Sequence, residues 1–279
     1  MGHFWVGISG WTYAGWRGVF YPKKLPHKRE LEYASRQFNS LEINGTFYSL
    51  QRPDTFASWY AATPPGFRFA VKGSRFITHM KKLKEVDAAL ANFFASGVLA
   101  LKEKLGPILW QFPPQLAFNQ DRFAEFLEML PATTTDAAAL AKKHDQRVTG
   151  RSYLRADKQR RIRHAFEIRH ESFMVPEFFT LLRRHKAAFV VADTAGLWPY
   201  SEEPTADFMY VRLHGASELY TSGYGDDELA TWAKRIRRWQ RDTYVYFDND
   251  RKVRAPFDAQ RLAKRLGIKF SSKTGERAA

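Results

Sequence analysis

The chain has 279 residues, of which 44% are hydrophobic and 15% aromatic, so it is long enough to bury a large core. It contains no cysteine, which excludes disulfides, thiolate metal sites and thiol catalysis. Its formal net charge of +15 favours an anionic partner. No apolar run approaches the roughly 20 residues that cross a bilayer, and the start MGHFWVGISGW lacks a signal-peptide pattern. We therefore expect a cytoplasmic protein with no membrane partner.

Eight short apolar runs with the composition of β-strands recur along the chain. The expected strands cover residues 4–10, 38–44, 67–73, 107–113, 164–170, 188–194, 208–215 and 243–250. Helix-like amphipathic segments lie between most of them, at 53–62, 83–104, 121–130, 176–186, 227–240 and 256–266. Alternating strands and helices pair in parallel, and eight units in about 250 residues are typical of a (β/α)8 TIM-type barrel. An open doubly wound sheet is the alternative, but no glycine-rich phosphate fingerprint follows the first strand.

The barrel is expected to form a single domain over residues 1–270, followed by a disordered polar tail at 271–279. A basic excursion is expected between the fourth and fifth strands, because that connection exceeds the usual loop length. It should contain a helix near 136–144 and then the basic segment 142–163, whose run begins KKHDQRVTGR. Such a run can contact phosphate groups, although a solvated basic face is its commoner meaning.

Successive residues of a strand point to opposite faces, so each predicted strand divides into two sets. In HAFEIRH, Phe166 and Ile168 share one face, whereas Glu167 and Arg169 share the other. The second face becomes polar toward the C-terminal end of nearly every strand, which is where barrel enzymes bind substrate. The predicted ring at this mouth comprises Glu42, Asn44, Lys72, Gln111, Glu167, Arg169, Asp193, Arg212, His214 and Asp248.

This ring suits anion binding and acid–base chemistry. Arg169 and Arg212 can each hold a phosphate or carboxylate by two parallel hydrogen bonds, and Lys72 adds a point charge. Asn44 and Gln111 are further candidates for ligand binding. The candidate catalytic or orienting groups are Glu42, Glu167, Asp193, His214 and Asp248. Alternatively, the opposite charges form a mutually neutralised network that only stabilises the fold.

Aromatic residues in the first two loops after strands add candidate ligand contacts. Trp11 and Tyr48 can stack on a sugar or base, although such residues equally well form a small satellite core. A catalytic metal is disfavoured because His214 is the only histidine of the ring and Lys72 and Arg169 place positive charge beside it. We therefore expect neither a metal nor a cofactor.

The motifs GISGWTYAGW, FNSLEINGTFY, FRFAVKG, ILWQFPP, HAFEIRHESF, FVVADTAG, YVRLHG and YVYFDND occur in the same order as in the domain of unknown function 72 family, also called YecE-like. The resemblance covers residues 4–266. It implies a (β/α)8-type barrel but no function. Members look like relatives of the endonuclease IV and xylose isomerase barrels, which use metal clusters at the strand ends. This chain lacks most histidine ligands of the endonuclease IV pattern, which puts metal-dependent cleavage of nucleic acid in doubt.

Three functions remain open at this point. The leading hypothesis is a barrel that binds a phosphate-bearing ligand, either a small molecule or nucleic acid, in the charged pocket at the mouth. The second is an isomerase or hydrolase of sugars or sugar phosphates, with its mouth covered by the aromatic loops. The third is a non-catalytic interaction protein whose ring is a structural ion-pair network. The sequence alone leaves open whether the protein is an enzyme, and its oligomeric state.

Overall fold

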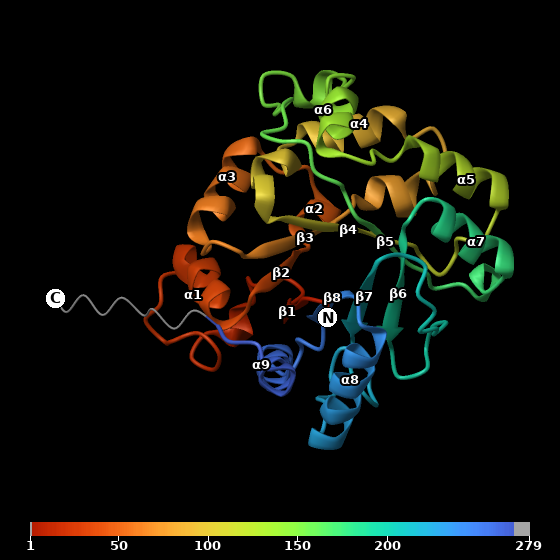
Figure 1. Ribbon diagram of the computed structural model, residues 1–279. Coiled ribbons are helices and arrows are strands. Elements are labelled where there is room, and N and C mark those ends of the chain that lie inside the picture. Colours follow the sequence, from red (N-terminus) through yellow and green to blue (C-terminus); the bar gives the residue numbers. More distant parts are fainter. Residues whose placement is uncertain (1, 271–279) are drawn as a thin grey trace.

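Eight parallel strands form the centre of the molecule in a computed structural model that describes residues 2–270 (Figure 1). They are β1 (Phe4–Ile8), β2 (Ser40–Ile43), β3 (Arg68–Lys72), β4 (Leu105–Gln111), β5 (His164–Glu167), β6 (Ala188–Asp193), β7 (Phe208–Leu213) and β8 (Asp242–Phe247). The pairing order is β1-β8-β7-β6-β5-β4-β3-β2, and a bridge between Ser9 and Glu42 joins the two outer strands. The sheet is therefore a nearly closed barrel, and the TIM-type prediction is confirmed.

Helices cover the outside of the barrel and fill most crossovers between strands. They are α1 (Glu30–Gln37), α2 (Gly45–Tyr48), α3 (Pro53–Ala62), α4 (Asp87–Ala95), α5 (Gln120–Met129), α6 (Thr134–Ala141), α7 (Pro176–Arg184), α8 (Asp226–Trp239) and α9 (Ala255–Leu266). Five 3-10 segments are η1 (Ala14–Trp16), η2 (His27–Arg29), η4 (Val98–Lys104), η5 (Gln146–Val148) and η6 (Glu171–Phe173), and η3 (Phe76–Met80) is a π-helix. The crossover from β6 to β7 contains no helix, all of its residues being described.

The single helix predicted over 83–104 is wrong. The structure has α4 and then the 3-10 segment η4, separated at Gly97, which has a φ of +121°. A Cβ atom at Gly97 would lie 2.7 Å from the Cα of Pro53, so α3 packs directly against the backbone here. The helix ends because a regular helix does not continue through that positive φ, which only glycine tolerates well.

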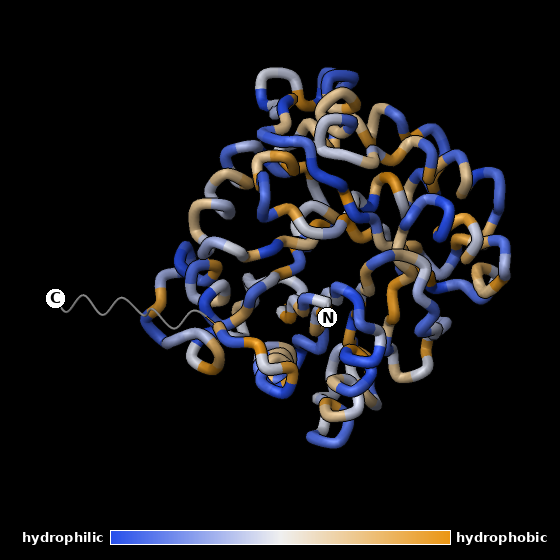
Figure 2. Tube along the Cα trace, viewed as in Figure 1, coloured by the Kyte–Doolittle hydropathy of each residue, from blue (hydrophilic) through white to orange (hydrophobic). Residues whose placement is uncertain are grey.

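The barrel wall separates two apolar layers. The outer layer lies between strands and helices and includes Val71, Phe166 and Val211. The inner layer fills the barrel with Ala70, Leu109, Ala165, Ala188, Val190, Ala192, Phe208, Tyr210, Tyr244 and Tyr246. In Figure 2 the outer helices alternate between hydrophobic and hydrophilic colours, as helices with one buried side do. Alternate strand residues therefore face opposite layers, as the period of two predicts.

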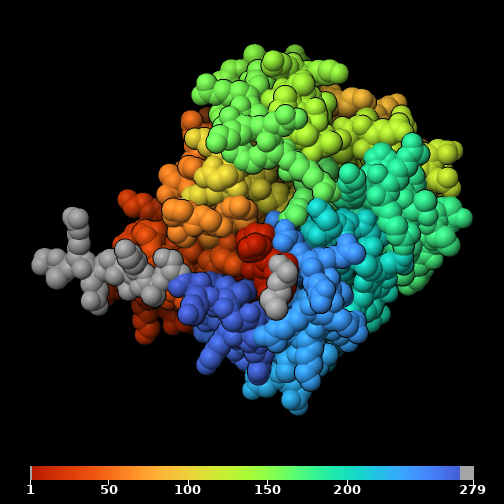
Figure 3. Space-filling model, in the orientation of Figure 1, coloured from red at the N-terminus to blue at the C-terminus, as the bar shows by residue number. Residues whose placement is uncertain are grey.

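The basic segment 142–163 ends at the N-terminal face of the barrel, opposite the mouth. It docks on α4 through the Tyr153 amide, which donates to the Ala95 carbonyl at 2.8 Å. Near its end, Arg163 pairs with Asp242 at the start of β8, at 2.9 Å. Figure 3 shows the first described residues, in red, near the centre of this face. The end of the segment therefore lies opposite the polar ring, whereas Arg147 lines a small separate cavity with Tyr48 and Ser74, on the side of the mouth.

Two expectations concern the chain as a whole. The predicted disordered tail, 271–279, lies outside the described residues. Within residues 2–270, every helix is too short or too polar to pass through a bilayer.

Candidate functional site

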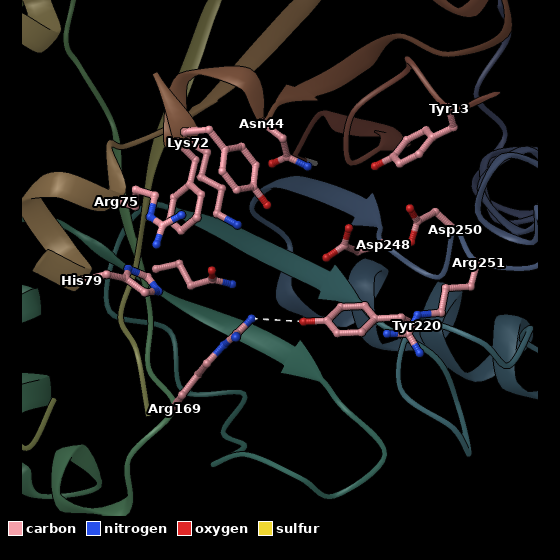
Figure 4. A pocket seen from close by; sticks show the side chains of 13 residues that line it. Tyr13, Asn44, Lys72, Arg75, His79, Arg169, Tyr220, Asp248, Asp250 and Arg251 are labelled. Carbon is pink, nitrogen blue, oxygen red and sulfur yellow. Dashed lines mark hydrogen bonds between the residues drawn. The ribbon is translucent and has the colours of Figure 1, made fainter. Parts of the chain in front are cut away.

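A cavity of about 630 Å³ opens at the C-terminal ends of the strands (Figure 4). Strand ends and the loops after them contribute its lining: Tyr13, Asn44, Phe47, Tyr48, Lys72, Arg75, His79, Gln111, Arg169, Tyr220, Asp248, Asp250 and Arg251. In Figure 4 the cations Lys72, Arg75 and Arg169 lie on one side, and the carboxylates of Asp248 and Asp250 lie on the other. The cavity therefore presents opposite charges to whatever occupies it.

Beneath the cavity lies a set of charged side chains that we call the buried network, formed by Glu42, Glu167, Arg212, His214 and Asp248. Arg212 is fully buried at its centre. Its guanidinium donates to Oε1 of Glu42 at 2.9 Å, to Oε2 of Glu167 at 2.7 Å and to Oδ2 of Asp248 at 3.0 Å. Further bonds run from Nε to Glu42 and from Nη2 to Ser9. Every nitrogen of the guanidinium is therefore engaged within the protein.

The two glutamates of the network are saturated as well. Glu42 also accepts from the Tyr210 hydroxyl at 2.6 Å and from the Ser9 hydroxyl. Glu167 also accepts from Nε2 of Gln111 at 2.8 Å, its neighbour in the paired strands β4 and β5. Burial alone would raise the pKa of Glu167, but the positive charges around it, of which Arg212 is the strongest, hold this pKa well below its ordinary value. Glu167 is thus a permanently charged acceptor.

Asp248 connects the network to the cavity, because it bonds Arg212 and also lines the cavity. Its Oδ2 lies 3.1 Å from Nδ1 of His214, which is fully buried. Burial would raise the pKa of Asp248, but Arg212 and then His214 lower it to about 2. Asp248 therefore presents a fixed negative charge to the cavity.

Lys72, the last residue of β3, is the buried cation that lines the cavity without an ionic partner. It is 8% exposed, and its ammonium lies 4.3 Å from the centre of the Phe47 ring. No described residue accepts a hydrogen bond from Nζ or lies within ion-pair distance of it. Burial, and then the charge of Arg212, lower the pKa of Lys72 to about 8. Near neutral pH, part of the Lys72 population is therefore an uncharged amine.

Arg169 links the network to the opposite wall of the cavity. Its Nη2 donates to Oε1 of Glu167 at 3.2 Å and to the Tyr220 hydroxyl at 3.3 Å. The guanidinium lies 3.7 Å from the centre of the Trp198 ring, a cation–π contact. These contacts hold Arg169 in place, while its remaining donors stay on the cavity side.

The loop after β3 brings two more basic residues to the cavity. The π-helix η3 closes with a bond from the Lys81 amide to the Phe76 carbonyl at 2.9 Å. Short π-helices are common at functional sites, because the wider turn redirects side chains. Here η3 begins just after Arg75 and carries His79, and both line the cavity. Burial, and then Lys72, lower the pKa of His79 to about 4, so the imidazole is neutral near neutral pH.

Asp250 lies two residues after Asp248, but its electrostatics are opposite. It lines the cavity without an ionic partner among the described residues. Burial, and then the negative charge of Asp248, raise the pKa of Asp250 to about 6. Asp250 and Lys72 are thus two cavity groups that can each gain or lose a proton near neutral pH.

The predicted site residues, the ring together with Trp11 and Tyr48, divide into those that line the cavity, those buried below it and those outside the site. Asn44, Tyr48, Lys72, Gln111, Arg169 and Asp248 line the cavity. Glu42, Glu167, Arg212 and His214 are fully buried below it. The prediction that Arg212 grips an anion directly is therefore corrected, because its donors are already occupied by carboxylates. Glu42, Glu167 and His214 also do not reach the cavity. The prediction that they contact a ligand directly is therefore corrected: they hold in place the residues that line the cavity.

Two predicted residues lie outside the site. Asp193 pairs in register with Leu213, an outer-layer residue, whereas Ala192 pairs with Arg212 and faces inward. Alanine at 192 is compatible with either layer, because small residues also fill the barrel interior. Asp193 instead accepts from the Tyr224 hydroxyl at 3.2 Å. Trp11 packs edge-on against Trp59 of α3, with ring centres 5.4 Å apart, and so forms part of the outer core.

Several lining residues were not among the predicted site residues: Tyr13, Phe47, Arg75, His79, Tyr220, Asp250 and Arg251. All lie outside the strands, in the segments that follow them, Phe47 in α2 and His79 in η3, where side-chain direction does not follow the period of two. A usable signal was available in the sequence, since basic, acidic or aromatic residues stand within a few positions of several strand ends. As for metals, residues 2–270 contain no cluster of three or more histidine, aspartate or glutamate side chains suited to hold an ion.

The fold and the cavity together define a TIM-type barrel protein with a charged, ligand-sized cavity at its C-terminal strand ends. A family model described as "Protein of unknown function DUF72" matches residues 5–278. The chain belongs to this family, which agrees with the resemblance in its motifs.

Two relatives support this assignment, and one further solved structure is similar in fold alone. The UPF0759 protein YunF of Bacillus subtilis is 23% identical over 95% of both chains. A DUF72 family protein from Thermotoga maritima, known from a crystal structure, is 29% identical with a TM-score of 0.74, over 95% of this chain and 99% of that one. A D-psicose 3-epimerase from Clostridium cellulolyticum, solved with D-tagatose, is similar in fold, with a TM-score of 0.52 at 11% identity over 96% of this chain and 98% of that one.

Proposed function

We propose that the protein binds a small phosphorylated sugar, or a closely similar hydroxylated phosphate ester, in the cavity at the barrel mouth. The observation that carries this proposal is the convergence of Lys72, Arg75, Arg169 and Arg251 on one cavity. These cations come from three separate loops or strand ends and face only two lining carboxylates. An anionic ligand balances this excess of positive charge.

The size of the cavity supports a small molecule rather than a nucleic acid duplex. Its volume, about 630 Å³, lies within the range of small-molecule pockets, roughly 300–1,000 Å³. A duplex is far wider than such a cavity. The known epimerase of similar fold was solved with the sugar D-tagatose, which is a further reason to test sugars first.

The lining residues supply distinct roles in this proposal. Arg75 and Arg251 are exposed at the rim and have no side-chain hydrogen bond to a described residue, so they are available for phosphate oxygens. Asn44 and Gln111 offer amide groups to hydroxyls, and Tyr48, 70% exposed, offers a face for stacking. Asp250, whose pKa is raised to about 6, is placed to transfer a proton as a general acid or base.

The test is isothermal calorimetry with ribose 5-phosphate and glucose 6-phosphate beside the unphosphorylated sugars. Arg75→Gln combined with Arg251→Gln should weaken binding of the phosphate ester by about 10- to 100-fold per charged hydrogen bond lost. The matched control combines Lys142→Gln with Arg184→Gln, because it also removes two positive charges, from exposed positions that do not line the cavity. Equal affinity for phosphorylated and plain sugars, or equal losses in the control, would refute the proposal.

A further inference from the structure

The most unusual group in the cavity is the amine of Lys72. A buried lysine normally has a carboxylate or carbonyl partner, since an unpaired buried charge is costly. The Lys72 ammonium instead faces the cavity and lies 4.3 Å from the centre of the Phe47 ring. Among the described residues, no hydrogen bond or ion pair of the Lys72 ammonium offsets the free-energy cost of burying it.

Lys104 shows how the same chain treats a structural buried lysine. It is 4% exposed, and its ammonium donates to the carbonyls of Tyr60 and Thr63, both at 2.6 Å, and to the Thr63 hydroxyl at 3.1 Å. All three donors are thereby used, and Lys104 lies outside the cavity. The two lysines are thus similarly buried, but the Lys104 ammonium is fully hydrogen-bonded, whereas the Lys72 ammonium faces the cavity without a hydrogen-bond partner among the described residues.

The surroundings of Lys72 favour the neutral amine. Burial and the charge of Arg212 lower its pKa, while Glu42, Glu167 and Asp248 act in the opposite direction without forming an ion pair with it. These carboxylates are already paired with Arg212. His79, on the facing π-helix, is held neutral by burial and by the nearby cations, through its lowered pKa.

We propose that Lys72 is a nucleophile that forms a Schiff base with an aldehyde or ketone group of the ligand. A desolvated lysine beside another cation is the usual form of such a nucleophile. The inference rests on the proposed function and narrows its ligand class to phosphate esters that carry a carbonyl group. Arg75, which lies on the same side of the cavity as Lys72 in Figure 4, would hold the phosphate while the carbonyl reaches the Lys72 amine.

The step balances without any further reactant. The lone pair of Nζ attacks the carbonyl carbon, a C–N bond forms, and the carbonyl electrons move to oxygen. The carbinolamine then loses this oxygen as water, together with the two protons that left the nitrogen, and a C=N bond remains. Asp250 titrates near neutral pH but lines the opposite side of the cavity from Lys72, so it would exchange those protons through intervening water.

The experiment compares glyceraldehyde 3-phosphate, glycerol 3-phosphate and plain glyceraldehyde as probes on the whole protein. Each is incubated with the protein and sodium borohydride, which reduces an imine to a stable amine, and modified lysines are identified by peptide mass spectrometry. Binding of glycerol 3-phosphate, which has no carbonyl group, is measured separately by calorimetry. Lys104 and the exposed Lys142 are internal references in the same digest.

We expect the adduct on Lys72 to exceed that on Lys104 and Lys142 by at least about tenfold, and to increase as pH rises toward about 8. Lys72→Arg keeps the charge and should abolish this adduct while glycerol 3-phosphate still binds. Lys72→Met, which removes the charge but keeps the length, is the second variant if the arginine disturbs folding.

Each outcome separates the two proposals. Binding of glycerol 3-phosphate with no adduct on Lys72 overturns the nucleophile and leaves the proposed function standing. An adduct on Lys72 formed equally with plain glyceraldehyde, without glycerol 3-phosphate binding, overturns the phosphate ligand and supports the nucleophile. Modification of Lys72 no greater than that of Lys142 also overturns the inference.

Discussion

The buried network and the wall of the cavity use the same residue types in opposite ways. In the network, the Arg212 guanidinium forms ion pairs with Glu42, Glu167 and Asp248. On the wall, Lys72, Arg75 and Arg251 line the cavity without an ionic partner among the described residues. The paired charges hold strands together across the barrel, whereas the unpaired ones face the cavity. Pairing, rather than residue type, therefore separates structural charges from candidate functional ones.

Asp248 and Asp250 show the contrast within three residues of chain. Arg212 and His214 overcome burial to lower the pKa of Asp248 to about 2. At Asp250, burial together with the charge of Asp248 outweighs the lowering effects of Tyr13 and Arg251 and raises the pKa to about 6. One carboxylate is therefore a permanent charge and the other a group that titrates, a division of roles typical of acid–base sites.

The largest expected effect tests whether the network is structural. Arg212→Met leaves three buried carboxylates without their shared cation and should lower the free energy of unfolding by about 3–5 kcal/mol. Urea unfolding measures this loss. The control, Arg160→Met, breaks a partly exposed pair with Asp157 and should cost at most about 1 kcal/mol. Equal losses in the two variants would contradict the distinction.

Replacing Asp248 should have a smaller effect on the free energy of unfolding, and that effect should depend on pH. The folded pKa of Asp248 lies below the unfolded value, so the stabilisation is fully present above about pH 4 and is lost as pH falls toward about 2. At neutral pH, Asp248→Asn should cost about 2 kcal/mol by this linkage. Unfolding curves of both proteins from acidic to neutral pH provide the measurement. A cost that stays constant with pH would show that Arg212 does not govern this carboxylate.

The ionisation of Asp250 should change stability with pH in the opposite direction to that of Asp248. The folded pKa of Asp250 is raised, so its protonated form favours the fold at low pH, and stability decreases as pH rises through about 6. Asp250→Asn should therefore stabilise the protein by about 1 kcal/mol at mildly alkaline pH, after allowance for its partial exposure, and change little in acid. The same titration series measures it. If turnover of a sugar phosphate is found, the same variant should be inactive.

The smallest effect on stability is expected at the rim. Arg75→Gln should change the free energy of unfolding by no more than about 0.5 kcal/mol, because Arg75 is exposed and donates to no described residue. Thermal unfolding without ligand measures this change, and with ribose 5-phosphate the variant should lose much of the ligand's stabilising shift. A large loss without ligand would place Arg75 in the structural group instead.

The strand pattern and most of the site are predictable from local sequence. Alternation within strands brought Glu42, Lys72, Gln111, Glu167 and Arg212 to the inner face, because a strand residue and its second neighbour always share a side. The rule failed at Asp193, since alanine at 192 is compatible with either layer. It also could not reach loop residues such as His79, which a π-helix directs into the cavity.

The sequence by itself determined the barrel, the order of its strands and the polar character of their C-terminal ends, because these follow from local periodicity. Only the tertiary structure decided which charges are paired. Arg212 and Glu42 lie 170 positions apart, and no local pattern says that they meet while Lys72 has no such partner. Pairing depends on distances across the barrel. Together with burial, those distances set the pKa values that separate the permanently charged Asp248 from the titrating amine of Lys72.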